Sequence, residues 1–200
     1  MSGWTIGAII AAAVGVVICL PVGALGFAMA RAFGSFGVEE SKFECSVNAS
    51  QLAQAASMYS LDSGGLLPEP TRWSTALQPY TISSAFRCPA APEAQCGYSM
   101  NEKLRGPYGR SALRLVSVSA PAETVMFFDS GGGWNSCGLG PQVVGRHNGD
   151  AVVASVDGHS YWTDPKMLSS QYWEPGHLAT PGGASWTATG FGTAGSSEYG

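Results

Sequence analysis

The sequence predicts an α+β fold in which a long N-terminal helix packs on a sheet formed by the residues that follow it. Three observations predict this fold class. The first 30 residues carry no charged side chain, the next segment repeats apolar residues at helical spacing, and two strand-like runs flank Asp157-Gly158. Because an amphipathic helix must bury its apolar face, we expect it to dock on that sheet.

Residues 1–33 are predicted to form a transmembrane helix. Arg31 is the first charged residue, and an apolar run of this length can cross the roughly 30 Å core of a bilayer. Helix is the form that satisfies the backbone in lipid, although Pro21 should kink it. Three readings stay open: a lone anchor, an assembly surface built on small residues, and a signal peptide removed after Ala28–Ala30.

Residues 34–60 are predicted to continue the stem as an amphipathic helix, formed from about Val38 to Ser60 and ended by Gly64-Gly65. The apolar stripe comprises Val38, Cys45, Leu52 and Tyr59, with Ala49 and Ala56 between them. The opposite, polar face comprises Glu39, Glu40, Lys42, Glu44, Asn48 and Gln51.

Residues 61–166 are predicted to form a globular head. A short helix is expected at 72–77, and strands are expected at 98–101, 124–129, 151–156 and 159–163, where β-branched and aromatic residues gather. Residues 113–118 alternate in polarity, and a strand and a turn both stay open there. Asp157-Gly158 predicts a tight hairpin whose two central residues both take positive φ.

Residues 167–200 are predicted to be a C-terminal tail. They contain only two charged residues, Glu174 and Glu198, among Gly, Ser, Thr, Ala and scattered aromatic residues. Such low-complexity sequence buries little core by itself. A flexible tail and a strand that bridges subunits both stay open.

Composition and motifs argue against several function classes. Charged residues make up 12% of the chain, the net charge is −4 and no basic cluster occurs, so nucleic acid is not an expected partner. The chain has no Gly-x-Ser-x-Gly, no His-Glu-x-x-His and no phosphate-binding loop, so an enzyme is the weaker class and no cofactor is expected.

No metal site is predicted, because a turn role suffices for Asp157. The residues that could gather around a metal are His147, Asp157, His159, Asp150 and Asp129. A calcium loop at 129–135 would have few oxygen ligands. The chain has five cysteines but no Cys-x-x-Cys, so a zinc cage is not expected. If the domain is exported, disulfides among the four cysteines beyond Cys19 are the natural reading.

Several blocks of the chain together resemble type IV pilins and pseudopilins. In chain order they are Gly3–Ile6, Leu20–Val22, Ala30–Ala32, Cys45–Tyr59, Phe86–Pro89, Tyr98–Asn101, Pro121–Asp129, Arg146–Gly149 and Asp157–His159. The most specific feature is the spacing of nine residues between His147 and Asp157-Gly158. It matches the His-x9-Asp-Gly signature of a large bacterial group of prepilin-like proteins.

This resemblance implies a pilin-like fold, with the long helix packed on an antiparallel sheet and the head outside the cytoplasmic membrane. It implies processing at Gly3 and Trp4 and a structural role in a filament or secretion pseudopilus. The expected partners are the membrane and further copies of this chain or other pilin-like subunits. The chain departs from the family at Ala8, where a glutamate is usual, and in lacking a basic leader. A membrane-anchored binding module that stays monomeric is the alternative.

The resemblance also suggests a disulfide pairing. Cys45 and Cys88 occupy family positions, whereas Cys96 and Cys137 do not and look like an added pair. The implied bonds are Cys45–Cys88 and Cys96–Cys137. A local Cys88–Cys96 bond is the rival, because four cysteines allow three pairings and sequence alone does not choose.

Overall fold

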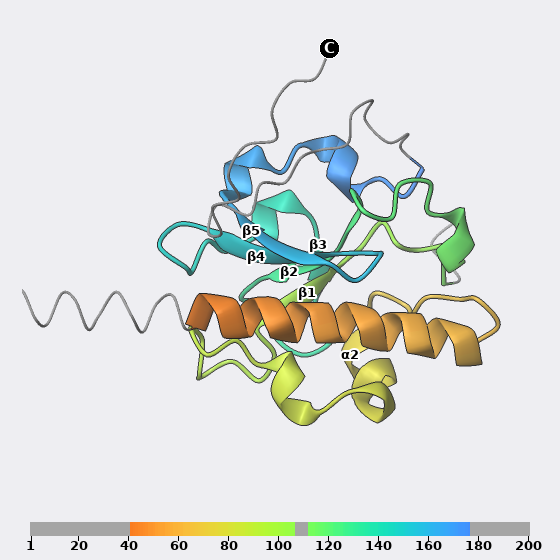
Figure 1. Ribbon diagram of the computed structural model, residues 1–200, viewed down its shortest axis with the longest axis horizontal. Helices are drawn as coiled ribbons and strands as arrows, with labels where there is room; N and C mark the ends of the chain where they lie inside the picture. Colours follow the sequence, from red (N-terminus) through yellow and green to blue (C-terminus); the bar gives the residue numbers. More distant parts are fainter. Residues whose placement is uncertain (1–40, 107–111, 177–200) are drawn as a thin grey trace, which may run out of the picture. The chain divides into compact units, whose positions relative to one another are not determined.

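The computed structural model describes residues 41–106 and 112–176. The processing residues Gly3 and Trp4, Ala8, the predicted transmembrane segment 1–33 and the last part of the predicted tail lie outside the described residues. Within the two described ranges, no helix is both long and apolar enough to cross a membrane. This part of the chain is α+β, with one long helix lying along a five-stranded sheet (Figure 1).

The long helix, here called the stem helix, is helical over residues 41–62. Its end agrees with the prediction. Gly64 and Gly65 take positive φ values of 66° and 88°, and the Gly65 N–H donates to the Ser60 carbonyl at 2.7 Å. A glycine in the left-handed region closes a helix in this way because it has no Cβ to clash.

The stem helix buries the predicted apolar stripe, but it buries more than that stripe. Cys45, Ala49, Leu52 and Ala56 are fully buried, as expected. The prediction that Lys42 and Asn48 lie on a solvated face is wrong, since they are 8% and 7% exposed. Both lie beside the apolar stripe, where the head supplies polar partners. Lys42 pairs with Asp150 at 2.8 Å, and the Asn48 side chain donates to the Arg87 carbonyl at 2.9 Å.

The sheet has the strand order β3-β1-β2-β4-β5. The strands are β1 (Tyr98–Asn101), β2 (Val125–Asp129), β3 (Cys137–Gly138), β4 (Ala151–Ser155) and β5 (Ser160–Thr163). Four of them match the predicted strands to within one residue at each end. Neighbouring strands from β1 through β2 and β4 to β5 are antiparallel, and Met100 pairs with Phe127 in the first of these ladders.

The fifth strand makes the sheet mixed and not purely antiparallel as expected. β3 runs parallel to β1, with Met100 opposite Cys137 and Asn101 opposite Gly138. The sequence does not predict this strand, because two residues are too few to show a periodic pattern. It forms because the Met100 N–H donates to the Ser136 carbonyl at 3.0 Å and the Glu102 N–H donates to the Gly138 carbonyl at 3.1 Å.

The hairpin between β4 and β5 has a three-residue loop, so the predicted two-residue turn is wrong. Gly158 alone has positive φ, at 97°. The Gly158 N–H donates to the Ser155 carbonyl at 3.0 Å, and the Ser155 N–H donates to the His159 carbonyl at 2.9 Å. This is a type I turn followed by a left-handed glycine, the usual geometry of a three-residue hairpin. Asp157 instead caps the turn, with Oδ1 accepting from the His159 N–H at 3.2 Å.

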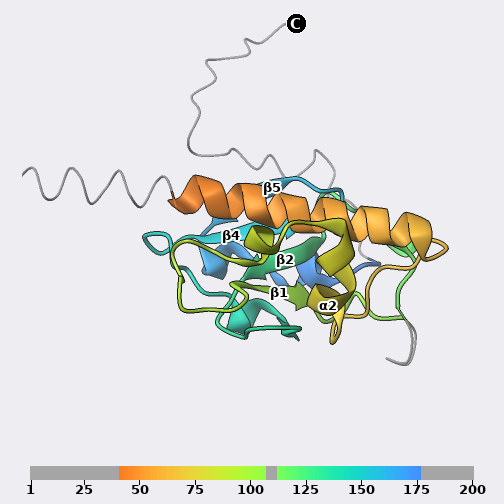
Figure 2. The ribbon, with the colours of Figure 1, turned by 90° about the horizontal axis from the view of Figure 1, so that it is seen from below.

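The stem helix lies along one face of the sheet (Figures 1 and 2), and buried side chains pack on both of its faces. Successive residues of a strand point to opposite faces. On β4, Val152 and Ala154 join the larger core under the stem helix, whereas Val153 joins a smaller core on the far face. The far-face core comprises Val125, Phe128, Val153, Tyr161, Leu168 and Trp173. Burial on both faces explains why the central strands β2 and β4 carry runs of apolar residues rather than an alternating pattern.

Shorter elements complete the head. Helix α2 (Trp73–Leu77) forms where a short helix was expected. Leu115–Ser117 is a 3-10 turn, which decides against a strand in that segment. Ser170–Trp173 is also a 3-10 turn, and Trp173, which is 3% exposed, packs edge-on against Phe128 at 5.1 Å. Part of the segment assigned to the tail therefore covers the far face of the sheet.

Candidate functional site

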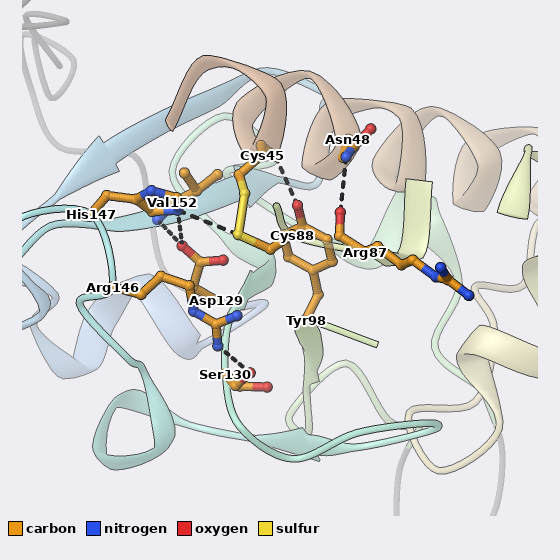
Figure 3. The surroundings of a disulfide bond; sticks show 10 residues. All are labelled: Cys45, Asn48, Arg87, Cys88, Tyr98, Asp129, Ser130, Arg146, His147 and Val152. Atoms are coloured by element: carbon orange, nitrogen blue, oxygen red, sulfur yellow. Dashed lines mark hydrogen bonds and ion pairs between the residues drawn. A yellow bond between two sulfur atoms is a disulfide. The ribbon is translucent and has the colours of Figure 1, made fainter. Parts of the chain in front are cut away.

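Four buried side chains from four separate segments meet under the stem helix (Figure 3). Cys45 comes from the stem helix, Cys88 from the loop after Phe86, Asp129 from the last position of β2, and His147 from the turn before β4. All four are fully buried, and their potential ligand atoms lie within 4.8 Å of one another.

A disulfide joins Cys45 to Cys88 across a Cα–Cα distance of 5.1 Å. This is the bond that the resemblance suggested, and it is confirmed. Nε2 of His147 lies 3.5 Å from Sγ of Cys88 and 3.2 Å from Oδ2 of Asp129. The same Oδ2 accepts from the Val152 N–H at 2.7 Å. The cluster therefore ties the stem helix, the loop at Cys88 and two strands together at one point.

The turn that presents His147 is set by local sequence. The His147 N–H donates to the Asp150 carbonyl at 3.0 Å, and the Asp150 N–H donates back at 3.1 Å. Between them, Asn148 and Gly149 have φ values of 56° and 96°. Two consecutive left-handed residues make a type I′ turn, for which Asn-Gly is the preferred pair. This signal was present in the sequence, and the hairpin it indicates was not predicted.

The neighbouring residue Arg146 fixes the other side of the cluster. Its guanidinium donates to the carbonyl of Ser130, the residue that follows Asp129. The Arg146 side chain lies beside Asp129 (Figure 3). Burial raises the pKa of the fully buried Cys96 thiol to about 11, although the positive charge of Arg146 acts to lower it.

The other two cysteines are free thiols, so the expected Cys96–Cys137 bond is wrong. Sγ of Cys96 donates to the Tyr98 carbonyl at 3.4 Å. Cys137 lies in β3, where the Arg105 guanidinium donates to its sulfur at 3.4 Å. Each thiol therefore has its own polar partner, and the rival Cys88–Cys96 bond is excluded as well.

The signature residues do not form one site. His147 belongs to the buried cluster, whereas Asp157 and Gly158 lie in the hairpin loop at the other end of β4. Asp157 pairs instead with the His159 ring, whose Nδ1 lies 2.5 Å from Oδ1. Among the five candidate metal ligands, the side-chain pairs in contact are therefore Asp129 with His147 and Asp157 with His159, and Asp150 pairs with Lys42.

Both turns of the signature contact the stem helix through a polar seam. Three seam residues, one turn apart on the helix, are Lys42, Ser46 and Ser50. Lys42 bonds Asp150 at 2.8 Å and lies 4.7 Å from the Trp162 ring. Ser46 bonds the Ser160 hydroxyl at 2.8 Å, and the Ser50 hydroxyl donates to the Gly158 carbonyl at 2.7 Å. The seam and the disulfide together fix the helix on the sheet.

The arrangement favours a structural clamp over catalysis. A nucleophile or a general base must reach its substrate, and all four cluster residues are fully buried. The described part of the chain also has a separate open pocket of about 250 Å³. Its lining comprises Gln78, Thr81, Ser83, Phe86, Arg87, Gln95 and Trp134.

Comparisons with known proteins do not add to this picture. No family model matches the sequence, and neither a curated protein nor a solved structure showed significant similarity.

Proposed function

We propose that this chain is a structural subunit of a pilin-like filament or secretion pseudopilus, anchored through its apolar N-terminal segment. The observation that supports this most is the stem helix, which is locked to the sheet on one side and carries exposed apolar residues on the other. These residues, here called the outer stripe, are Phe43, Val47, Met58 and Leu61, which are 63%, 38%, 53% and 83% exposed.

The outer stripe lies on one face of the helix. At 3.6 residues per turn, the 18 positions from Phe43 to Leu61 are five complete turns, so the two residues point in the same direction. Val47 and Met58 lie within about 60° of that direction at about 100° per residue. Isolated exposed apolar residues need no explanation, but a row of them along one helix favours contact with another helix.

The location proposed for the head is outside the cytoplasmic membrane, with the segment 1–33 in the bilayer. The Cys45–Cys88 disulfide supports this location, because disulfides persist in oxidising compartments and are rare in the cytosol. Protease added to intact spheroplasts should digest the head, and full protection of the head would contradict this topology.

Electron microscopy of cell-surface filaments, with the subunit identified by mass, tests the proposed assembly. Phe43→Ser combined with Leu61→Ser should reduce filaments while leaving the head folded, because both side chains point away from the core. Val116→Ser is the matched control, since Val116 is 86% exposed but belongs to the 3-10 turn Leu115–Ser117 and not to the stem helix. Filaments unaffected by the double substitution would remove the role of the outer stripe. A wild-type chain that stays monomeric would contradict the assembly itself.

A monomeric binding module is the second candidate, and the open pocket favours it. Phe86 and Trp134, with ring centroids 5.0 Å apart, form an aromatic wall of a pocket whose lining also includes Arg87 and two glutamines. Such a lining suits a small polar ligand with an apolar face. A monomer that loses ligand binding on Trp134→Ala, with no filaments on the cells, would favour this function over assembly.

A further inference from the structure

We propose that Cys45, Cys88, Asp129 and His147 bind one Zn²⁺ when the Cys45–Cys88 disulfide is reduced. The disulfide and the zinc site would then be alternative states of the same buried cluster. This inference goes beyond the proposed assembly function and does not depend on it.

The ligand set fits zinc by chemistry. Zn²⁺ binds thiolate, imidazole and carboxylate, and structural sites hold four such ligands in a tetrahedron. The cluster offers two sulfurs, one imidazole nitrogen and one carboxylate, and all of its ligand atoms lie within 4.8 Å of one another. No other such group occurs among residues 41–106 and 112–176.

The ligand spacing also fits. Zinc–ligand distances of 2.0–2.3 Å at tetrahedral angles place nitrogen and oxygen ligands about 3.4 Å apart, and sulfur and nitrogen ligands about 3.6 Å apart. Nε2 of His147 lies 3.2 Å from Oδ2 of Asp129 and 3.5 Å from Sγ of Cys88. Two edges of the tetrahedron are therefore present before a metal binds. What must change is the separation of the two sulfurs, which cleavage of their bond permits.

Two buried polar atoms of the cluster have no hydrogen-bond partner. A purely structural contact between these side chains gives no reason for leaving them unpaired. Oδ1 of Asp129 and Nδ1 of His147 are unpaired. All polar contacts of the His147 side chain run through Nε2, the atom that faces the sulfur and the carboxylate (Figure 3). A free carboxylate oxygen in a dry site is costly for a purely structural role and available to a cation.

The charges balance. Two thiolates, one carboxylate and Zn²⁺ sum to −1, and the Arg146 guanidinium, bonded to the Ser130 carbonyl, supplies a positive charge beside the site. A dithiol can supply the reduction: it gives two electrons and two protons to the Cys45–Cys88 bond and itself becomes a disulfide. Zn²⁺ then displaces the two thiol protons and stays divalent throughout.

The consequence concerns the chain before oxidation. A nascent chain with free thiols lacks the bond that holds the stem helix to the sheet. Zinc would hold the same four segments at the same point, because binding to a site made of distant residues stabilises the folded state.

The test uses the full-length chain in detergent, reduced with a phosphine and exposed to zinc sulfate, followed by removal of unbound metal. We expect one zinc per reduced chain by mass spectrometry, none in the oxidised chain, and a zinc-dependent rise in Tm. Cobalt in place of zinc should give a thiolate charge-transfer band and tetrahedral d–d bands. Asp129→Asn, which keeps an acceptor for the Val152 N–H, should weaken binding by more than about tenfold. Asp150→Asn and Cys137→Ser are the controls and should bind normally.

The outcomes decide the proposal. A reduced chain that stays folded by circular dichroism and takes up no zinc overturns it. Equal uptake by the wild-type, Asp129→Asn and His147→Ala chains also overturns it, because the metal would then bind elsewhere. If reduction unfolds the chain, refolding on addition of zinc supports the proposal, and failure to refold overturns it.

Discussion

Removing the Cys45–Cys88 bond should destabilise the head more than any other pair of cysteine substitutions. The two residues are 43 positions apart. In the chain-entropy model, removing a cross-link that closes a loop of this length raises the entropy of the unfolded chain. This lowers the free energy of the unfolded state by about 4 kcal/mol at 25 °C. Strain in the native state and residual structure in the unfolded state can reduce this value. The expected loss for Cys45→Ala combined with Cys88→Ala is therefore about 2–4 kcal/mol, relative to a control that removes two unbonded sulfurs.

The control is Cys96→Ala combined with Cys137→Ala, which removes the two free thiols and leaves the cross-link intact. It should cost about 1–2 kcal/mol, mainly for the cavity at the fully buried Cys96. Urea unfolding of the full-length chains in detergent, followed by tryptophan fluorescence, measures both. Trp73 is a suitable probe because it is fully buried, with its ring centroid 4.7 Å from that of Phe127.

Two results would refute this reasoning. Equal losses in the two double variants would show that the cross-link contributes nothing beyond its packing. A wild-type midpoint that does not change on reduction in metal-free buffer would show the same without any substitution.

Three smaller effects follow from the geometry. Gly158→Val should lower the free energy of unfolding in urea by about 1–3 kcal/mol, because φ at this position is 97°. Space is not the cause, since the nearest atom to an added Cβ, Gln54 Cγ, would lie 3.8 Å away. Gly158→Asn should cost less, and equal costs would show that φ is not the cause. Gly145→Ala should cost about 1–3 kcal/mol, because a Cβ there would lie 2.2 Å from the Gly149 carbonyl oxygen and must displace the turn; an unchanged midpoint would contradict this. Since burial raises the pKa of Cys96 from 9.0 to about 11, the unfolded thiol ionises first, and stability should fall as the pH rises from about 9 to 11. Cys96→Ala should flatten that slope, and parallel wild-type and variant curves would exclude Cys96 as its source.

Residues with a strong local pattern could be assigned from the sequence. The four apolar strands, the short helix at Trp73–Leu77 and the glycine end of the stem helix are visible because periodicity and backbone preference act over neighbouring residues. β3 was missed because two residues carry no such pattern and only the distant β1 makes Cys137–Gly138 a strand.

Errors on the polar residues have a different cause. Lys42 and Asn48 are hydrophilic, so the pattern placed them in solvent, but each finds a specific partner in the head and is buried with it. The buried site could be predicted only in part. The resemblance paired Cys45 with Cys88, whereas the contact of His147 with Asp129 depends on how β2 and β4 lie side by side, which no local pattern encodes.

The spacing of the signature has a physical explanation in this fold. The nine residues between His147 and Asp157 comprise the end of one turn, the whole of β4 and the first residue of the next turn. A strand alternates its faces, so adding or removing one residue would turn the apolar side chains of β4 to the wrong sides of the sheet. The length of β4 also sets the distance between two attachment points on the stem helix, the buried cluster at Cys45 and the Gly158 carbonyl at Ser50. A change in this count would move one attachment out of register with the other, so the separation of His147 from Asp157 matters in this chain although the two residues lie at opposite ends of β4.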